Sequence, residues 1–66
     1  MRNYKFKIIF QTLLEEIKWG LTIREAVILA QGEQIKLGNN FTIKNVYKWN
    51  NNLEEWEEQE INPVIY

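Results

Sequence analysis

The residues of this chain that could do chemistry are its glutamates, and five of them lie in one short run. The stretch LEEWEEQE, Leu53 to Glu60, places five glutamates and one glutamine around a single tryptophan. Paired carboxylates act as general acid and base in glycosidases, but those enzymes need a deep cleft between the two groups. A chain of 66 residues is too short to build one. Two interpretations remain: a surface that imitates the phosphates of a nucleic acid, or the solvated side of a small domain.

Most other residue types that act in catalysis are missing, because the chain contains no Cys, His, Ser or Asp. Without these residues the usual zinc sites, serine triads and calcium loops cannot be assembled. We therefore predict that the protein is not an enzyme, with no catalytic residue, no metal site and no cofactor. The absence of Cys also excludes a disulfide framework, which small secreted domains normally need. This favours a cytoplasmic location.

The chain also lacks the segments that direct a protein to a membrane. Its longest apolar run, AVILA, is far shorter than the roughly 20 residues that span a bilayer. Charged residues and Asn interrupt the first ten positions, which do not resemble a signal peptide. Residues with AT-rich codons are frequent, as in low-GC Gram-positive bacteria and their phages. We expect the protein in the cytoplasm of a bacterial host cell, with no membrane partner.

The N-terminal half predicts one strand followed by two short helices. YKFKIIF alternates apolar and polar residues with a period of two, which indicates a half-buried strand or, alternatively, the first turn of a longer helix. Thr12 and Glu15 have the spacing of a capping box, which predicts a helix over Leu13 to Trp19 that ends at Gly20. Thr22 and Glu25 repeat that spacing and predict a second helix that ends at Gly32.

The segment from Glu33 to Asn50 changes to a period of two and predicts a β-hairpin. Gly38, Asn39 and Asn40 would form its turn, since Gly and Asn tolerate positive φ. One face of this hairpin would then face the core, and its expected members are Ile35, Leu37, Phe41, Ile43, Tyr47 and Trp49.

The acid run itself fits either a helix capped by Asn52 or a strand that pairs back on TIKNVYKW. The aromatic, turn, aromatic order of VYKWNNNLEEWEE favours the strand. Trp56 would then meet Tyr47 on the core side, Glu55 would face Lys48, and Glu57 would lie close to Lys44. Pairing of this kind leaves three acids unmatched, namely Glu54, Glu58 and Glu60. The last residues, PVIY, predict a final short strand or a docked tail.

These elements predict one domain over residues 1–66. Its fold class is α+β, with two short N-terminal helices packed on a small antiparallel β-sheet made of hairpins.

Charge is divided sharply along the chain, which can mark a partner surface. Residues 1–48 carry eight cations and four acids, whereas residues 49–66 carry five acids and no cation. Exposed Trp is enriched at binding hot spots. The predicted site for a protein partner therefore combines acids with two aromatic residues, Glu54, Glu58, Glu60, Trp49 and Trp19.

Two alternatives to a protein-binding surface stay open. A nucleic-acid-binding site would combine lysines with a ring on which a base can stack, and its candidates are Lys36, Lys44, Lys48 and Tyr47. A calculated isoelectric point near 5.3 makes direct nucleic-acid binding the less favoured of the two functions. A homo-oligomeric structural adaptor is the third function considered, since so small a domain benefits from association.

Size, composition and layout together resemble the small accessory proteins of Gram-positive phages. The resemblance rests on a Cys-free chain rich in Asn, Ile and Lys, with capped short helices, a Gly-Asn hairpin and a concentrated acid patch. Some of those proteins are anti-CRISPR or other anti-defence inhibitors. The resemblance implies a stoichiometric inhibitor whose partner is a host protein, such as a defence protein that handles nucleic acid.

Overall fold

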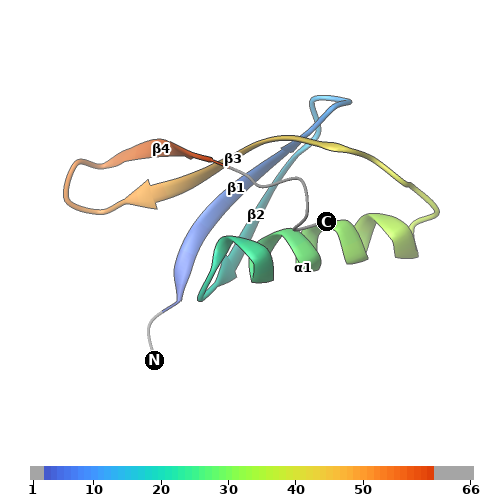
Figure 1. Cartoon of the computed structure of the whole chain (residues 1–66), viewed down its shortest axis with the longest axis horizontal. Helices are drawn as coiled ribbons and strands as arrows, with labels where there is room; N and C mark the ends of the chain where they lie inside the picture. Colours follow the sequence, from blue (N-terminus) through green and yellow to red (C-terminus); the bar gives the residue numbers. More distant parts are fainter. Residues whose placement is uncertain (1–2, 61–66) are drawn as a thin grey trace.

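The protein, described here over residues 3–60 by a computed structural model, is a four-stranded antiparallel sheet with one helix on one of its faces (Figure 1). The elements in chain order are β1 Tyr4–Phe10, β2 Glu15–Gly20, α1 Ile23–Lys36, β3 Ile43–Asn50 and β4 Glu55–Gln59. The strands lie in the order β2-β1-β3-β4, so that β1 and β3 are central. The predicted strand or tail at residues 63–66 lies outside the described residues.

The predicted α+β class is confirmed, but the prediction of two N-terminal helices is wrong. Residues expected to form the first helix belong instead to β2, which pairs with β1 from Ile9↔Glu15 to Tyr4↔Gly20. Thr12 lies in the turn between these strands, where Leu13 adopts a φ of 71° and its N–H donates to the Phe10 carbonyl at 2.8 Å. Pairing with a neighbouring strand satisfies the backbone of this segment, and this overrides the local helix signal.

The second predicted helix exists and is longer than expected. Thr22 caps its start as predicted, because the Thr22 hydroxyl accepts from the Glu25 N–H at 3.2 Å. The helix then continues through Gly32 to Lys36. Its buried side chains are Ala26, Val27, Ala30 and Gln34. Because Gln34 extends the buried stripe by one turn, packing outweighs the roughly 1 kcal/mol that a mid-helix glycine costs.

Gly38, which was predicted to turn a hairpin, ends the helix instead. It has a φ of 84°, and its N–H donates to the Ile35 carbonyl at 2.9 Å, while the Asn39 N–H donates to the Gln34 carbonyl at 2.8 Å. These two bonds form a Schellman motif, which satisfies carbonyls that a helix end leaves free. The predicted hairpin over residues 33–50 is therefore wrong, and its second half alone forms a strand, β3.

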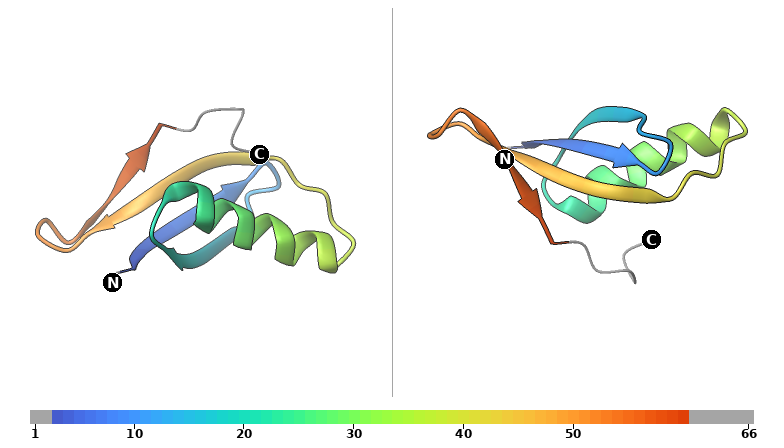
Figure 2. Two further views of the ribbon diagram at one scale, coloured as in Figure 1. Left: turned by 60° about the horizontal axis from the view of Figure 1, so that its bottom comes forward. Right: turned by 90° about the horizontal axis from the view of Figure 1, so that it is seen from above.

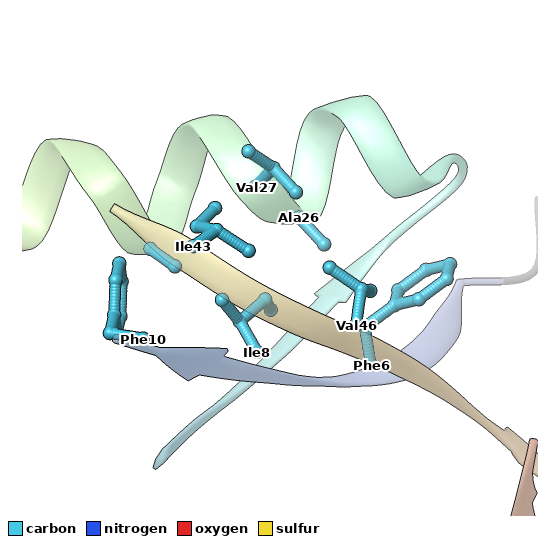
Figure 3. Packing of buried hydrophobic residues seen from close by; sticks show 8 residues of the cluster. Phe6, Ile8, Phe10, Ala26, Val27, Ile43 and Val46 are labelled. Carbon is cyan, nitrogen blue, oxygen red and sulfur yellow. The ribbon is translucent and has the colours of Figure 1, made fainter. Parts of the chain in front are cut away.

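The core lies between α1 and the central strands (Figure 3). Its fully buried members are Phe6, Ile8, Phe10, Ala26, Val27, Ala30, Ile43 and Val46. Phe41 packs against this cluster with its ring 6.1 Å from that of Phe10. Among the predicted core residues Ile43 is buried as expected, whereas Ile35 and Leu37 are exposed because they lie on the outer side and at the end of α1.

A polar network joins the second half of α1 to β2. Gln34, the only buried polar side chain in the described part of the chain, donates through Nε2 to Glu16 Oε2 at 2.6 Å and accepts from Asn39 Nδ2 at 3.0 Å. Lys18 forms ion pairs with Glu16 at 3.5 Å and with Glu33. The helix is thus positioned over β2 by polar contacts as well as by the core.

β3 and β4 form a hairpin that extends away from the helix (Figure 2). The acid run is a strand, as favoured from the sequence, but its predicted register is wrong. Tyr47 faces Glu58, Lys48 faces Glu57 and Trp49 faces Trp56. The turn begins at Asn50, whose side-chain oxygen accepts from the Asn52 and Leu53 N–H groups, and it ends at Glu54 with a φ of 52°. The four residues between the paired Asn50 and Glu55 lie one position later than the predicted loop of Asn50 to Leu53, and this shifts the pairing.

Candidate functional site

The candidate site is the face of the sheet opposite α1, which no other element in residues 3–60 covers. Side chains of directly paired residues in an antiparallel sheet lie on the same face. Strand pairing and the period of two therefore identify the side chains of this surface. We name its part that crosses all four strands the aromatic face, which consists of Lys5, Lys7, Ile17, Trp19, Tyr47, Trp49, Trp56 and Glu58.

These residues form two rows that run across all four strands. The first row contains Trp19 on β2, Lys5 on β1, Trp49 on β3 and Trp56 on β4. The second row contains Ile17, Lys7, Tyr47 and Glu58 in the same strand order. All three tryptophans of the chain consequently lie on one face of the sheet.

Lysine ammonium groups hold the aromatic rings of β3 and β4 together. Lys5 Nζ lies 5.6 Å from the ring centroid of Trp49 and 5.5 Å from that of Trp56. Lys7 Nζ lies 4.6 Å from the centroid of Trp56, and 3.7 Å from a carboxylate oxygen of Glu15. Each cation–π contact contributes about 0.5–1 kcal/mol when it is exposed to water. The two central lysines therefore order the rings. Lys5 contacts rings, and Lys7 contacts both a ring and the carboxylate of Glu15.

The two indoles of the hairpin contact each other directly. The centroids of Trp49 and Trp56 lie 5.2 Å apart with an angle of 67° between the ring planes. This is the edge-to-face geometry that aromatic pairs favour. The hairpin therefore presents a preformed aromatic surface that needs little further ordering.

The β2 side of the aromatic face is the most exposed. Trp19 is 55% exposed and Ile17 is 44% exposed, whereas Tyr47, Trp49 and Trp56 are half-buried by their neighbours. A contiguous exposed surface of this apolar character marks an interaction site more often than a scattered exposed side chain does. This exposure follows from the alternating direction of side chains along β2. Glu16 and Lys18 point toward the helix, and Ile17 and Trp19 point away from it.

The acid run does not form one patch, because the period of β4 divides it between two faces. Glu58 lies on the aromatic face and accepts from Asn45 Nδ2 at 3.0 Å. Glu55 and Glu57 lie on the reverse face, opposite Asn50 and Lys48. Glu54 belongs to the turn, and Glu60 follows the end of β4.

Three of the five residues predicted to bind a protein partner are brought together by the structure. Trp19, Trp49 and Glu58 share the aromatic face, whereas Glu54 and Glu60 lie beyond the two ends of β4. Trp49 and Trp56 are not on the core side, contrary to the prediction, because the helix covers the other face of the sheet.

The residues predicted to bind nucleic acid are not brought together. Lys36 lies at the end of α1, and Lys44 is exposed at a bulge of β3, where Phe10 faces Ile43 and Ile9 faces Asn45. Lys48 lies on the reverse face, with its Nζ 3.9 Å from the ring centroid of Tyr4, whereas its neighbour Tyr47 lies on the aromatic face.

Sequence reasoning missed Lys5, Lys7 and Ile17 as members of the site. The alternation of YKFKIIF did place Lys5 and Lys7 on one face of a strand, and this signal could have identified them. Ile17 was hidden because its segment was assigned to a helix.

Other kinds of site receive no support from the described residues. Within residues 3–60, no three acidic side chains lie close enough to hold a metal ion. The single helix of this range is also too short and too polar to cross a membrane. Comparisons with models of protein families, with curated proteins and with solved structures found no match to the chain.

Proposed function

We propose that this chain is a non-enzymatic binding domain that docks onto another protein through its aromatic face. The observation that carries the proposal is the position of all three tryptophans in one uncovered surface, beside Tyr47 and Ile17. Trp and Tyr are the residues that most often dominate the energy of protein interfaces, because large, rigid rings bury much area at a small entropic cost.

The charges of the aromatic face favour a protein over a nucleic acid. Its two cations, Lys5 and Lys7, lie among two carboxylates, because Glu15 pairs with Lys7 and Glu58 belongs to the second row. Proteins that bind single strands normally surround their stacking rings with a positively charged groove. A balanced centre beside an acidic hairpin fits a partner surface that is apolar in the middle and basic at its rim.

A host protein that handles nucleic acid is the partner class that we propose, since such proteins carry basic surfaces. The chain would act on it as a stoichiometric inhibitor, because a domain that only binds acts by occupying a surface. Glu54, Glu58 and Glu60 would face the basic rim, and the rings of Trp19 and Trp49 would contact the apolar centre.

The test is affinity capture from a nuclease-treated lysate of a low-GC Gram-positive host, followed by titration with the captured protein. We expect a saturable complex that Trp19→Ala and Trp56→Ala each weaken at least about thirtyfold, the size of a hot-spot loss. Ile35→Ala is the matched control, because Ile35 is 63% exposed on the helix, away from the aromatic face. A complex that tolerates both Trp substitutions would contradict the proposal.

Single-stranded nucleic acid is the second candidate ligand, because a row of rings with Lys5 between them resembles a stacking platform. Tryptophan fluorescence distinguishes the two candidates, since every indole of the chain reports from the aromatic face. Quenching by a labelled oligonucleotide with a steep salt dependence would favour this candidate. Unchanged fluorescence up to high oligonucleotide concentration would favour the protein partner.

A further inference from the structure

A second feature of the molecule is the backbone edge of the sheet at β2, the strand whose Ile17 and Trp19 side chains belong to the aromatic face. β2 pairs with β1 on one side, and on its outer side no strand of residues 3–60 pairs with it. An edge of this kind presents unpaired backbone N–H and C=O groups to any further strand. The opposite edge, β4, carries Glu55, Glu57 and Glu58, and charges of one sign disfavour its pairing with a second copy of itself.

We propose that two copies of this chain associate through their β2 edges to form one continuous antiparallel sheet. A two-fold axis perpendicular to the sheet pairs β2 with β2 of the second copy and keeps both aromatic faces on the same side. Residues that face each other must then belong to the same face. The two registers that use most of the strand are therefore centred on Ile17 or on Lys18.

Charge selects between these two registers. Centring on Lys18 places two lysines directly opposite each other, which is destabilising. Centring on Ile17 places Ile17 against Ile17, Trp19 against Glu15, and each Lys18 against Glu16 of the second copy. Lys18 already pairs with Glu16, 3.5 Å away, and with Glu33 of its own copy, so each of these cations would gain a third carboxylate across the axis.

The flank of α1 above this edge is complementary to the same arrangement. A groove between α1 and β2 is lined by Lys18, Ile28, Leu29, Gly32, Glu33 and Lys36. Ile28 and Leu29 are about half exposed there, and the absent side chain of Gly32 leaves open space. This flank therefore combines apolar side chains with room for a close neighbour.

Strand spacing brings the two helices into packing distance. Because α1 contacts both β2 and β1, pairing of two β2 strands about 4.8 Å apart would place the helix axes roughly 10 Å apart. Helices pack at about 8–10 Å. The groove residues of each copy would then contact the α1 of the other, which buries Ile28 and Leu29. Backbone pairing, ion pairs and apolar contact thus point to the same occupant, a second copy of this chain.

Sedimentation of the purified chain over a dilution series tests the association without any other partner. We expect a reversible monomer–dimer equilibrium that Ile17→Glu weakens at least about tenfold, because two carboxylates would meet on the axis. Within one copy the new Glu faces Lys7, so the fold is retained. Leu53→Glu is the matched control, since Leu53 is 60% exposed in the β3–β4 turn. A wild-type chain that stays monomeric up to about 1 mM would overturn the proposal.

Cysteine cross-linking tests the register, because the chain has no cysteine of its own. In the proposed register Ile17→Cys faces its own copy across the axis, within the Cα distance of roughly 4.4–6.8 Å that a disulfide spans. Trp19→Cys is the control, since the two copies of position 19 would be roughly 14 Å apart along the strands. Rapid oxidation to a dimer at position 17 and slow oxidation at position 19 is the expected result. Equal rates at both positions would overturn it.

Discussion

Residue-scale contacts explain how a small sheet keeps large aromatic side chains ordered without burying them. On the hairpin, Lys5 lies over two indoles, and the indoles meet edge to face. The methylene stems of lysine cover apolar surface while the ammonium group stays in water. The aromatic face is therefore ordered before any partner binds, which lowers the entropic cost of binding.

A double-mutant cycle measures the ring contact. Trp49→Ala, Trp56→Ala and the double variant should give a coupling free energy of unfolding of about 0.5–1.5 kcal/mol, the range for aromatic pairs. Urea unfolding of the four proteins provides the values. Additive effects would show that the two rings are ordered by their strands alone. Trp19→Ala paired with Trp56→Ala is the control cycle, and it should be additive because the two rings lie on opposite edge strands.

At the scale of elements, the decisive feature is where α1 ends. The chain has two glycines that could end the helix; α1 passes through Gly32 and ends at Lys36, two residues before the left-handed Gly38. Gly32 lies within the helix, and a Cβ added there would meet no atom within 4 Å. Gly38 has a left-handed φ of 84°. The same residue type therefore has opposite effects at two positions six residues apart.

Substitution of these glycines by alanine should change stability in opposite directions. Gly32→Ala should stabilise the protein by about 0.5–1 kcal/mol, because Ala loses less backbone entropy in a helix. Gly38→Ala should destabilise it by about 1–2 kcal/mol, because Cβ meets the following carbonyl in the left-handed conformation. The comparison uses the midpoints of urea unfolding, measured at a protein concentration low enough for the chain to be monomeric. Equal signs for the two changes would contradict the position of the helix end.

At the scale of the whole molecule, β1 holds the structure together. It lies between β2 and β3 and contributes three fully buried side chains, Phe6, Ile8 and Phe10, to a core of eight. A chain of this length has a total stability of roughly 3–10 kcal/mol. Because the core is small, the loss of one central contact removes a large fraction of the total free energy of unfolding.

Ile8→Ala and Ile9→Ala form a matched pair on the two faces of β1. Ile8 is fully buried beneath α1, whereas Ile9 is half-buried on the other face. We expect Ile8→Ala to cost about 2–5 kcal/mol and Ile9→Ala to cost about 1 kcal/mol or less. If Ile8→Ala does not fold, Ile8→Val should still cost about 0.5–1.5 kcal/mol. Equal losses for the two alanine variants in urea unfolding would contradict the assignment of the two faces.

The elements that could be predicted were those whose signal lies within a few residues. β1 follows from the alternation of YKFKIIF, the start of α1 from Thr22 and Glu25, and the β3–β4 turn from its three asparagines. β2 could not be predicted in this way, because the capping-box spacing at Thr12 is as good a local signal as that at Thr22. Pairing with β1 decided between them, and pairing is a contact between separate segments.

For the candidate site, Trp19, Trp49 and Glu58 were predicted from residue type and charge, and the structure places them on one face. Lys5 and Lys7 were missed, although their strand was predicted correctly. A period of two shows that a strand has two faces, and it does not show which of them a helix will cover.

The sequence by itself determined the α+β class, the first strand and the cap of the helix, and it favoured a strand over a helix for the acid run. Each of these depends on neighbouring residues, and the energies involved are local. Only the tertiary structure decided that α1 continues past Gly32 to Lys36, that 15–20 is a strand, and that the tryptophans face away from the core. These features depend on the side of the sheet on which α1 packs, and that side is determined by burial of Ala26, Val27 and Ala30 against β1 and β3.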